Sequence, residues 1–63
     1  MEILLRRVRR SKDITQAELA EMSGVSIQTI KDIERRQREN VQAGTLCKLA
    51  KSLEVPVEEL LEY

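Results

Sequence analysis

Apolar residues recur every three or four positions along most of the chain, which is the period of an amphipathic α-helix. The pattern predicts helices over residues 2–11, 16–23, 27–35 and 43–53, and a fifth that starts at about Pro56. Proline suits the first turn of a helix, because the N–H that it lacks would have no partner there. We therefore expect an all-α fold of five short helices.

The stretch over residues 16–35 predicts two helices joined by a tight turn. Gly24 can adopt the left-handed backbone that ends a helix, and Ser26 can cap the helix that follows. Thr15 and Glu18 have the spacing of a capping box, in which each side chain bonds the backbone N–H of the other. A turn this short makes the second helix cross the first steeply and leaves its outer face free.

The helix over residues 43–53 has a clear apolar stripe, formed by Leu46, Leu49, Ala50 and Leu53. Cys47 lies within this apolar pattern. A buried, inert thiol is therefore the prediction for Cys47, with a redox role as the alternative.

Composition narrows the classes of function. The chain has 63 residues, one cysteine and no histidine, and only 2% of its residues are aromatic. We expect one domain over residues 1–63, with an aliphatic core. An internal disulfide is impossible, and a zinc site or a nucleophile–base pair lacks the residues it needs. The sequence thus predicts no enzyme, no metal, no cofactor and no small-molecule ligand. Without a membrane-length apolar run or a signal peptide, a cytoplasmic location is expected.

The net charge is zero, but the charges are unevenly distributed. From Arg6 to Arg38 there are nine basic and five acidic residues, a balance of +4. From Glu39 to Tyr63 there are two basic and five acidic residues, a balance of −3, and Glu2 completes the sum. Such a distribution can present one basic face in a neutral molecule. The alternative is that these charges are solvated helix faces with local pairs.

Residues 16–35 resemble the helix-turn-helix of the lambda-repressor/Cro (Xre-type) family. The residues that match its opening, small, turn and core positions are Gln16, Ala20, Gly24, Val25, Ile30 and Ile33. The likeness extends from about Leu5 to Leu61 and includes the stretch TLCKLAKSLEVPVEELL. It implies a five-helix lambda-repressor-like domain that binds double-stranded DNA and regulates transcription, with repression expected. The alternative is a protein-interaction module, such as an adaptor or an antitoxin-like partner.

The chain departs from the family after the third helix. Many members have a glycine there, and this chain has Arg36. The helix can therefore end near Arg35 or continue toward Arg38 before Asn40 stops it.

The exposed helix is the predicted DNA reader, because its first residues can reach base edges in the major groove. The predicted base contacts are Ser26, Ile27, Gln28, Lys31 and Asp32. The resemblance puts Ile27 and Gln28 first: Gln28 can bond adenine twice, and Ile27 can pack on a thymine methyl or simply be partly buried. Lys31 can reach guanine or a phosphate. Asp32 can accept from cytosine, but pairing with Arg35 or Arg36 is favoured.

Phosphate contacts are predicted from the start of the second helix and from the segment after the third. The residues are Thr15, Gln16, Arg10, Arg36, Gln37, Arg38 and Asn40, with Lys12 beside Arg10. For each of them, the alternative is an ordinary solvated surface residue.

The resemblance also implies a structural ion pair between Arg9 and Glu34. A weak homodimer is expected from the apolar residues near the end of the chain, which are Val57, Leu60, Leu61 and Tyr63. The alternative places Val57 and Leu60 in the core and leaves only Leu61 and Tyr63 exposed.

Overall fold

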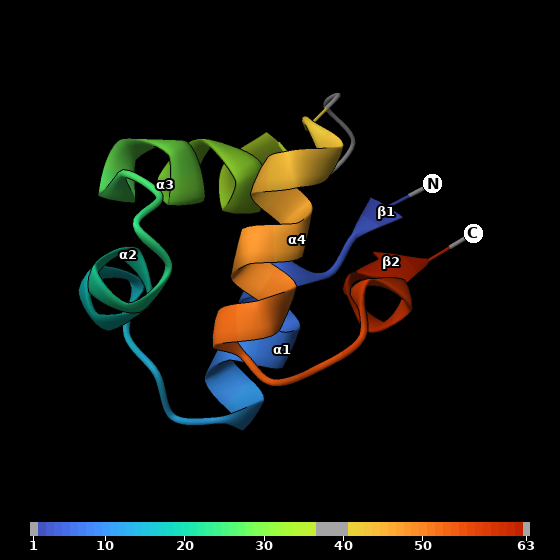
Figure 1. Ribbon diagram of the computed structural model, residues 1–63, viewed down its shortest axis with the longest axis horizontal. Helices are drawn as coiled ribbons and strands as arrows, with labels where there is room; N and C mark the ends of the chain where they lie inside the picture. The colour runs from blue at the N-terminus through green and yellow to red at the C-terminus, as the bar shows by residue number, and fades with distance from the viewer. Residues whose placement is uncertain (1, 37–40, 63) are drawn as a thin grey trace.

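The computed structural model describes residues 2–36 and 41–62. Within these ranges the chain forms four α-helices and one short 3-10 helix: α1 (Leu5–Ser11), α2 (Gln16–Ser23), α3 (Ile27–Arg36), α4 (Ala43–Ser52) and η1 (Val57–Leu60). In Figure 1, α4 runs through the middle, with α2 and α3 on one side of it and the last part of the chain on the other.

The first residues form a strand rather than part of a helix. β1 (Glu2–Ile3) pairs antiparallel with β2 (Leu61–Glu62), and Ile3 lies opposite Leu61. The prediction of a helix over residues 2–11 is therefore wrong at its start, and α1 begins at Leu5. The apolar pattern could not show this, because the partner strand lies at the other end of the sequence.

The predicted fifth helix is only one turn of 3-10 helix, over Val57–Leu60. It stops there because Leu61 has an extended backbone, with φ −121° and ψ 136°, and enters β2. The backbone N–H of Leu4 donates to the carbonyl of Leu60 at 2.7 Å, next to the strand pair. The described part of the chain therefore forms a small helix-turn-helix fold with four α-helices, and the predicted number of five is reached only if the 3-10 turn is counted.

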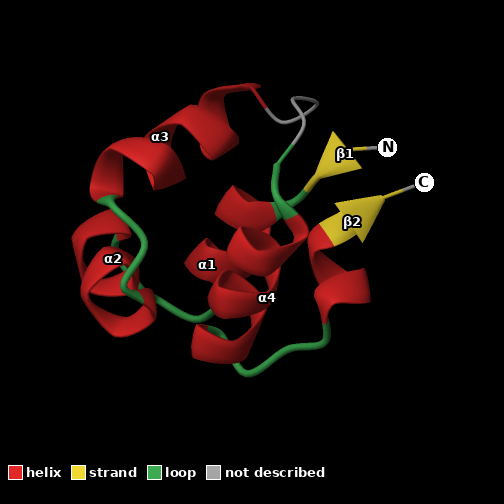
Figure 2. Ribbon diagram, turned by 45° about the horizontal axis from the view of Figure 1, so that its top comes forward, coloured by secondary structure: helices red, strands yellow, loops and turns green. Residues whose placement is uncertain are grey.

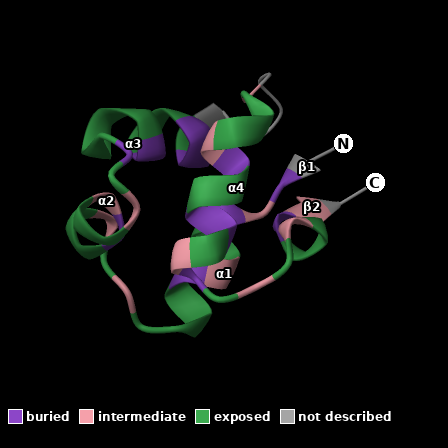
Figure 3. Ribbon diagram, viewed as in Figure 1, coloured by how far each residue is buried: buried purple, intermediate pink, exposed green. Residues whose placement is uncertain are grey.

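The core is aliphatic, as the composition predicts. Its buried residues come from β1, from each of the helices and from the segments next to them: Ile3, Leu5, Leu19, Val25, Ile30, Ile33, Leu46, Leu49, Ala50, Leu53 and Leu60. Figure 3 shows the buried segments facing the middle of the molecule and the exposed ones outside. The predicted buried face of α4 is confirmed.

Cys47 contradicts its prediction, because it is exposed. Leu46, Leu49 and Ala50 share the buried face of α4, and one step of about 100° from Leu46 takes Cys47 off that face. The apolar character of cysteine suggested burial, but the helical period places its side chain outside the core.

The helix ends follow the local signals in the sequence. The Thr15 hydroxyl accepts from the Glu18 N–H at 3.1 Å, and the Glu18 carboxylate accepts from the Thr15 N–H at 2.9 Å. Gly24 has a φ of +76°, and its N–H bonds the carbonyl of Ala20. The Ser26 hydroxyl accepts from the N–H of Thr29 at 3.2 Å at the start of α3. The capping box, the glycine turn and the second cap are confirmed.

The capping box makes stability depend on pH. Hydrogen bonds to Thr15, first to its backbone N–H, lower the pKa of Glu18 below the ordinary 4.5. A lowered carboxyl pKa stabilises the fold above the unfolded-state value, and this contribution disappears as the pH falls through the folded-state value. We expect Glu18→Gln to melt below the wild type at neutral pH, with the gap closing in acid. Thermal melts across the pH range measure this gap, and a gap that stays constant would contradict the expectation.

Candidate nucleic-acid interface

Helix α3 lies at the edge of the fold and exposes one face. Its inner face is buried through Ile30, Ile33 and Glu34. The predicted base-contact residues are all exposed: Ser26, Ile27, Gln28, Lys31 and Asp32. Figure 2 shows α3 at the outer edge of the molecule, next to α2. The fold therefore leaves the outer face of α3 accessible along its length.

The first turn of α3 presents an apolar side chain to solvent. Ile27 is 39% exposed, and Met22, near the end of α2, is 54% exposed. Sequence reasoning singled out Ile27 but missed Met22, which the 3.6-residue period does not place on the buried stripe. The Ser26 side chain is less available for a DNA contact than Ile27, because its hydroxyl is already bonded to the Thr29 hydroxyl at 2.8 Å.

A chain of hydrogen bonds runs along the exposed face of α3. The side-chain amide of Gln28 donates to Asp32 Oδ1 at 3.1 Å, and Arg35 Nη2 donates to the same oxygen at 3.1 Å. The predicted pairing of Asp32 is thus present, with Arg35 as its partner. Both side chains are more than half exposed, so the pair adds little to stability. The Asp32 carboxylate thus bonds both Gln28 and Arg35 in the structure.

Behind α3, a buried ion pair joins this helix to α1. Arg9 donates from Nε to Glu34 Oε2 at 2.7 Å and from Nη2 to Oε1 at 3.0 Å. Its Nη1 donates to the carbonyl of Ile14 at 2.7 Å. The side chains are only 11% and 5% exposed, and the bond to Glu34 raises the pKa of Arg9. The ion pair that the resemblance implied is therefore present, and it is bidentate.

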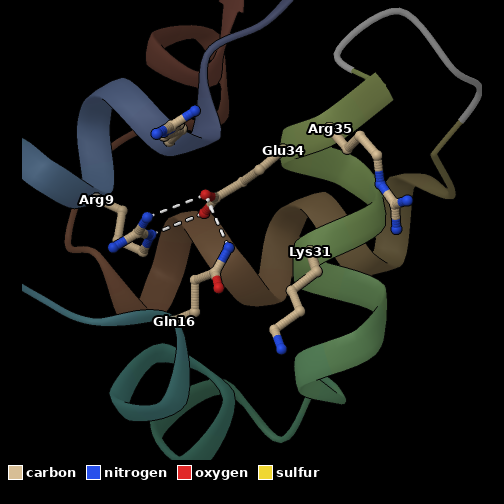
Figure 4. A pocket seen from close by; sticks show the side chains of 6 residues that line it. Arg9, Gln16, Lys31, Glu34 and Arg35 are labelled. Atoms are coloured by element: carbon tan, nitrogen blue, oxygen red, sulfur yellow. Dashed lines mark hydrogen bonds and ion pairs between the residues drawn. The ribbon is translucent and has the colours of Figure 1, made fainter.

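Gln16 belongs to the same network. Its side-chain N–H group donates to Glu34 Oε1 at 3.1 Å, so Glu34 accepts bonds from two neighbouring elements. Figure 4 shows Glu34 reaching from α3 toward Arg9, with Gln16 directed at the same carboxylate. The sequence predicted Gln16 as a phosphate contact and gave no sign of this internal bond, because its partner is eighteen positions away.

The other predicted phosphate contacts are only partly described. Arg10 and Lys12 are exposed at the end of α1, and Thr15 is exposed at the start of α2. Among the described residues α3 extends to Arg36, and its predicted continuation toward Arg38 lies outside the described ranges. Three further residues of the set lie outside the described ranges: Gln37, Arg38 and Asn40.

An open cleft of about 370 Å³ lies beside the buried ion pair. It is lined by Arg6, Arg9, Gln16, Lys31, Glu34 and Arg35, which come from α1, α2 and α3. Sequence reasoning did not single out Arg6. Its position three residues before Arg9 places both arginines on the same face of the helix. The sequence did not show which element would pack next to that face.

Within residues 2–36 and 41–62, no helix is long and apolar enough to cross a membrane. No group of three or more histidine, cysteine, aspartate or glutamate side chains in these ranges has the arrangement of a metal site.

Comparison with known proteins places this architecture in a family. A family model described as helix-turn-helix matches residues 5–60, and the chain belongs to the lambda-repressor/Cro (Xre-type) helix-turn-helix family. It is 42% identical over 57 residues to RghRB of Bacillus subtilis (strain 168), an uncharacterized HTH-type transcriptional regulator. That match covers 90% of this chain and 41% of the relative, so the chain spans about two-fifths of the relative's length.

A solved structure shows the same fold. The crystal structure of the restriction-modification controller protein C.AhdI from Aeromonas hydrophila superposes with a TM-score of 0.81 and 33% sequence identity. The match covers 90% of this chain and 85% of that chain.

Proposed function

We propose that this chain binds double-stranded DNA sequence-specifically through α3 and regulates transcription, acting as a repressor. The observation that carries the proposal is the exposed face of α3, which holds Ile27 and an oriented Gln28 while its inner face is anchored to α1 by Glu34. A reading helix needs both properties, since base contacts require accessible side chains on a fixed backbone. The family, and relatives described as a transcriptional regulator and a controller protein, support DNA binding and transcription regulation as the general function.

The geometry of Gln28 suits recognition of adenine. A bidentate contact uses the amide oxygen and one N–H, and a glutamine side chain has two N–H donors. The bond from Gln28 to Asp32 uses only one of these donors. Asp32 can therefore hold Gln28 in place while the remaining donor and the oxygen contact a base. Ile27, exposed in the same turn, would pack on a thymine methyl.

Phosphate contacts would fix the position of the domain on the duplex. We assign them to the exposed residues Arg10 and Thr15 and to the N–H groups at the start of α2, where Gln16 lies. The residues at and after the end of α3 complete the set: Arg36, Gln37, Arg38 and Asn40.

A two-fold homodimer would let two copies read two half-sites about one helical turn apart. The surface available for it is smaller than the sequence suggested, because Leu60 is fully buried and Val57 and Leu61 are half-buried. The proposed dimer is accordingly weak in solution and strengthened on DNA. The number of chains bound per selected site measures it.

The experiment that tests the function is selection of bound sequences from a random duplex pool at stated salt, followed by gel shifts. Sequence-specific, salt-sensitive binding is expected. If no duplex is bound, neither selected nor genomic, the DNA-binding proposal is wrong and the protein-interaction module takes its place.

The Gln28→Ala variant tests the assignment of α3 as the reader. We expect it to lose roughly 1–3 kcal/mol of binding free energy on the selected site, with little change on a scrambled site. Its salt dependence should match the wild type, because no phosphate contact is removed. Arg10→Ala is the contrasting variant, and it should weaken both DNAs about equally. Equal weakening of both DNAs by Gln28→Ala would contradict the placement of α3.

A further inference from the structure

We propose that the cleft between α1 and α3 is a phosphate-binding site, in which Arg6 and Lys31 bind a phosphate group of the DNA backbone. The inference rests on the proposed DNA-binding function and adds to it a site that is separate from the helix ends and from the segment after α3. It also assigns Lys31 to the backbone rather than to a base.

The floor of the cleft does not repel an anion. Glu34 is the one carboxylate among the lining residues, and it accepts two hydrogen bonds from Arg9 and one from Gln16. Arg9 cancels its charge at 2.7 Å in a largely buried pair. The pair at the bottom of the cleft therefore has no net charge, and the electrostatic potential in the cleft is set by the other charged residues that line it.

The rim of the cleft is positive. Arg6, Lys31 and Arg35 line it, and all three are exposed. Arg35 is engaged with Asp32, and Figure 4 shows it on the opposite side of α3 from Gln16 and the buried pair. Neither Arg6 nor Lys31 takes part in an ion pair among residues 3–35 and 41–61. These two cations, one from α1 and one from α3, are thus available for a ligand.

The lining also indicates the class of ligand. Every lining residue is polar or charged, whereas a site for a small organic molecule has mostly apolar walls. The cleft is open to solvent as well, which suits a group on a long strand. Arginine and lysine together are the side chains that bind phosphate most effectively, through a planar fork and a compact point charge.

The position of the cleft fits a strand bordering the bases that α3 reads. Lys31 lies three residues after Gln28 and four after Ile27, so it occupies the next turn of the same helix face. With Ile27 and Gln28 directed at base edges, a cation one turn further along α3, together with Arg6 of α1 in the same cleft, would lie at the wall of the groove, where the backbone runs. A phosphate held there would fix how deeply the helix enters.

The test is the salt dependence of DNA binding by the full chain with Arg6→Gln and with Lys31→Gln. Each variant should reduce the slope of log affinity against log salt by about 0.9, the value for one lost phosphate contact. The loss of affinity should be the same on the selected site and on a scrambled site. Arg7→Gln is the matched control for Arg6 and Lys48→Gln for Lys31, because both are exposed cations outside the cleft. Circular dichroism and thermal melts confirm that the variants fold.

Each other outcome overturns the inference in a distinct way. Wild-type slopes for both cleft variants would remove the site while leaving the DNA-binding function intact. A loss confined to the selected site for Lys31→Gln would make Lys31 a base reader. Titration of inorganic phosphate, followed by side-chain NMR signals, tests the source of the anion: binding at the cleft combined with unchanged DNA slopes would assign it to a free phosphate. A wild type that binds no duplex would refute the function itself.

Discussion

Replacing Glu34 with alanine should lower the free energy of unfolding by roughly 3–5 kcal/mol, because it leaves the buried guanidinium of Arg9 without its counter-charge. Arg9 side-chain exposure is only 11%, so water can replace the lost carboxylate only in part. The change also frees Gln16, whose amide bonds the same carboxylate. A core of this size rarely supplies more than about 3–5 kcal/mol of net stability, so the variant should be largely unfolded.

Urea unfolding of Glu34→Ala and wild type measures this loss. Glu21→Ala is the matched control, since it removes an exposed glutamate from a helix and should cost little. A double variant, Arg9→Met with Glu34→Leu, separates an uncompensated charge from lost packing, because an apolar pair should recover part of the stability. Equal melting temperatures for Glu34→Ala and the wild type would show that the pair does not hold α1 to α3.

Leu60→Ala should also be strongly destabilising, by about 2–5 kcal/mol, because Leu60 is fully buried and its removal leaves a cavity. Leu60 lies in η1, and the sequence analysis predicted it as part of a dimer surface. In the structure it packs in the single core with Leu5 and Leu53. The prediction therefore distinguishes a core role from an interface role at this position.

The control is Leu61→Ala, a neighbouring residue that is half-buried and should lose much less stability. Thermal unfolding at two protein concentrations measures both effects. If Leu60→Ala unfolds like the wild type but changes the mass in sedimentation, then Leu60 belongs to an interface and the packing described above is wrong.

Local signals in the sequence were sufficient for the centre of the fold. The capping box of Thr15 and Glu18, the left-handed Gly24 and the cap at Ser26 each depend on residues within a few positions, and the structure contains all of them. Helix α2 has the bounds that these signals predicted, Gln16–Ser23. Such interactions can be read from a sequence because the backbone geometry of a turn or helix end places the partners together.

Interactions between distant segments could not be derived from local pattern. The pairing of Ile3 with Leu61 depends on both ends of the chain meeting, and the bond from Gln16 to Glu34 depends on the packing of α2 against α3. The Arg9–Glu34 pair was anticipated only through the family resemblance. The cleft beside it needs three elements in place, so the sequence showed its cations but not their arrangement.

The pairing of β1 with β2 has a consequence for the order of folding. Its partners, Glu2 with Glu62 and Ile3 with Leu61, are separated by almost the entire chain, so closing this contact costs more loop entropy than forming α2 against α3. Contacts between near neighbours form first in chains of this kind. We expect the helix-turn-helix to take shape early and the strand pair to close last, so the chain ends join the structure only after α3 is already in place.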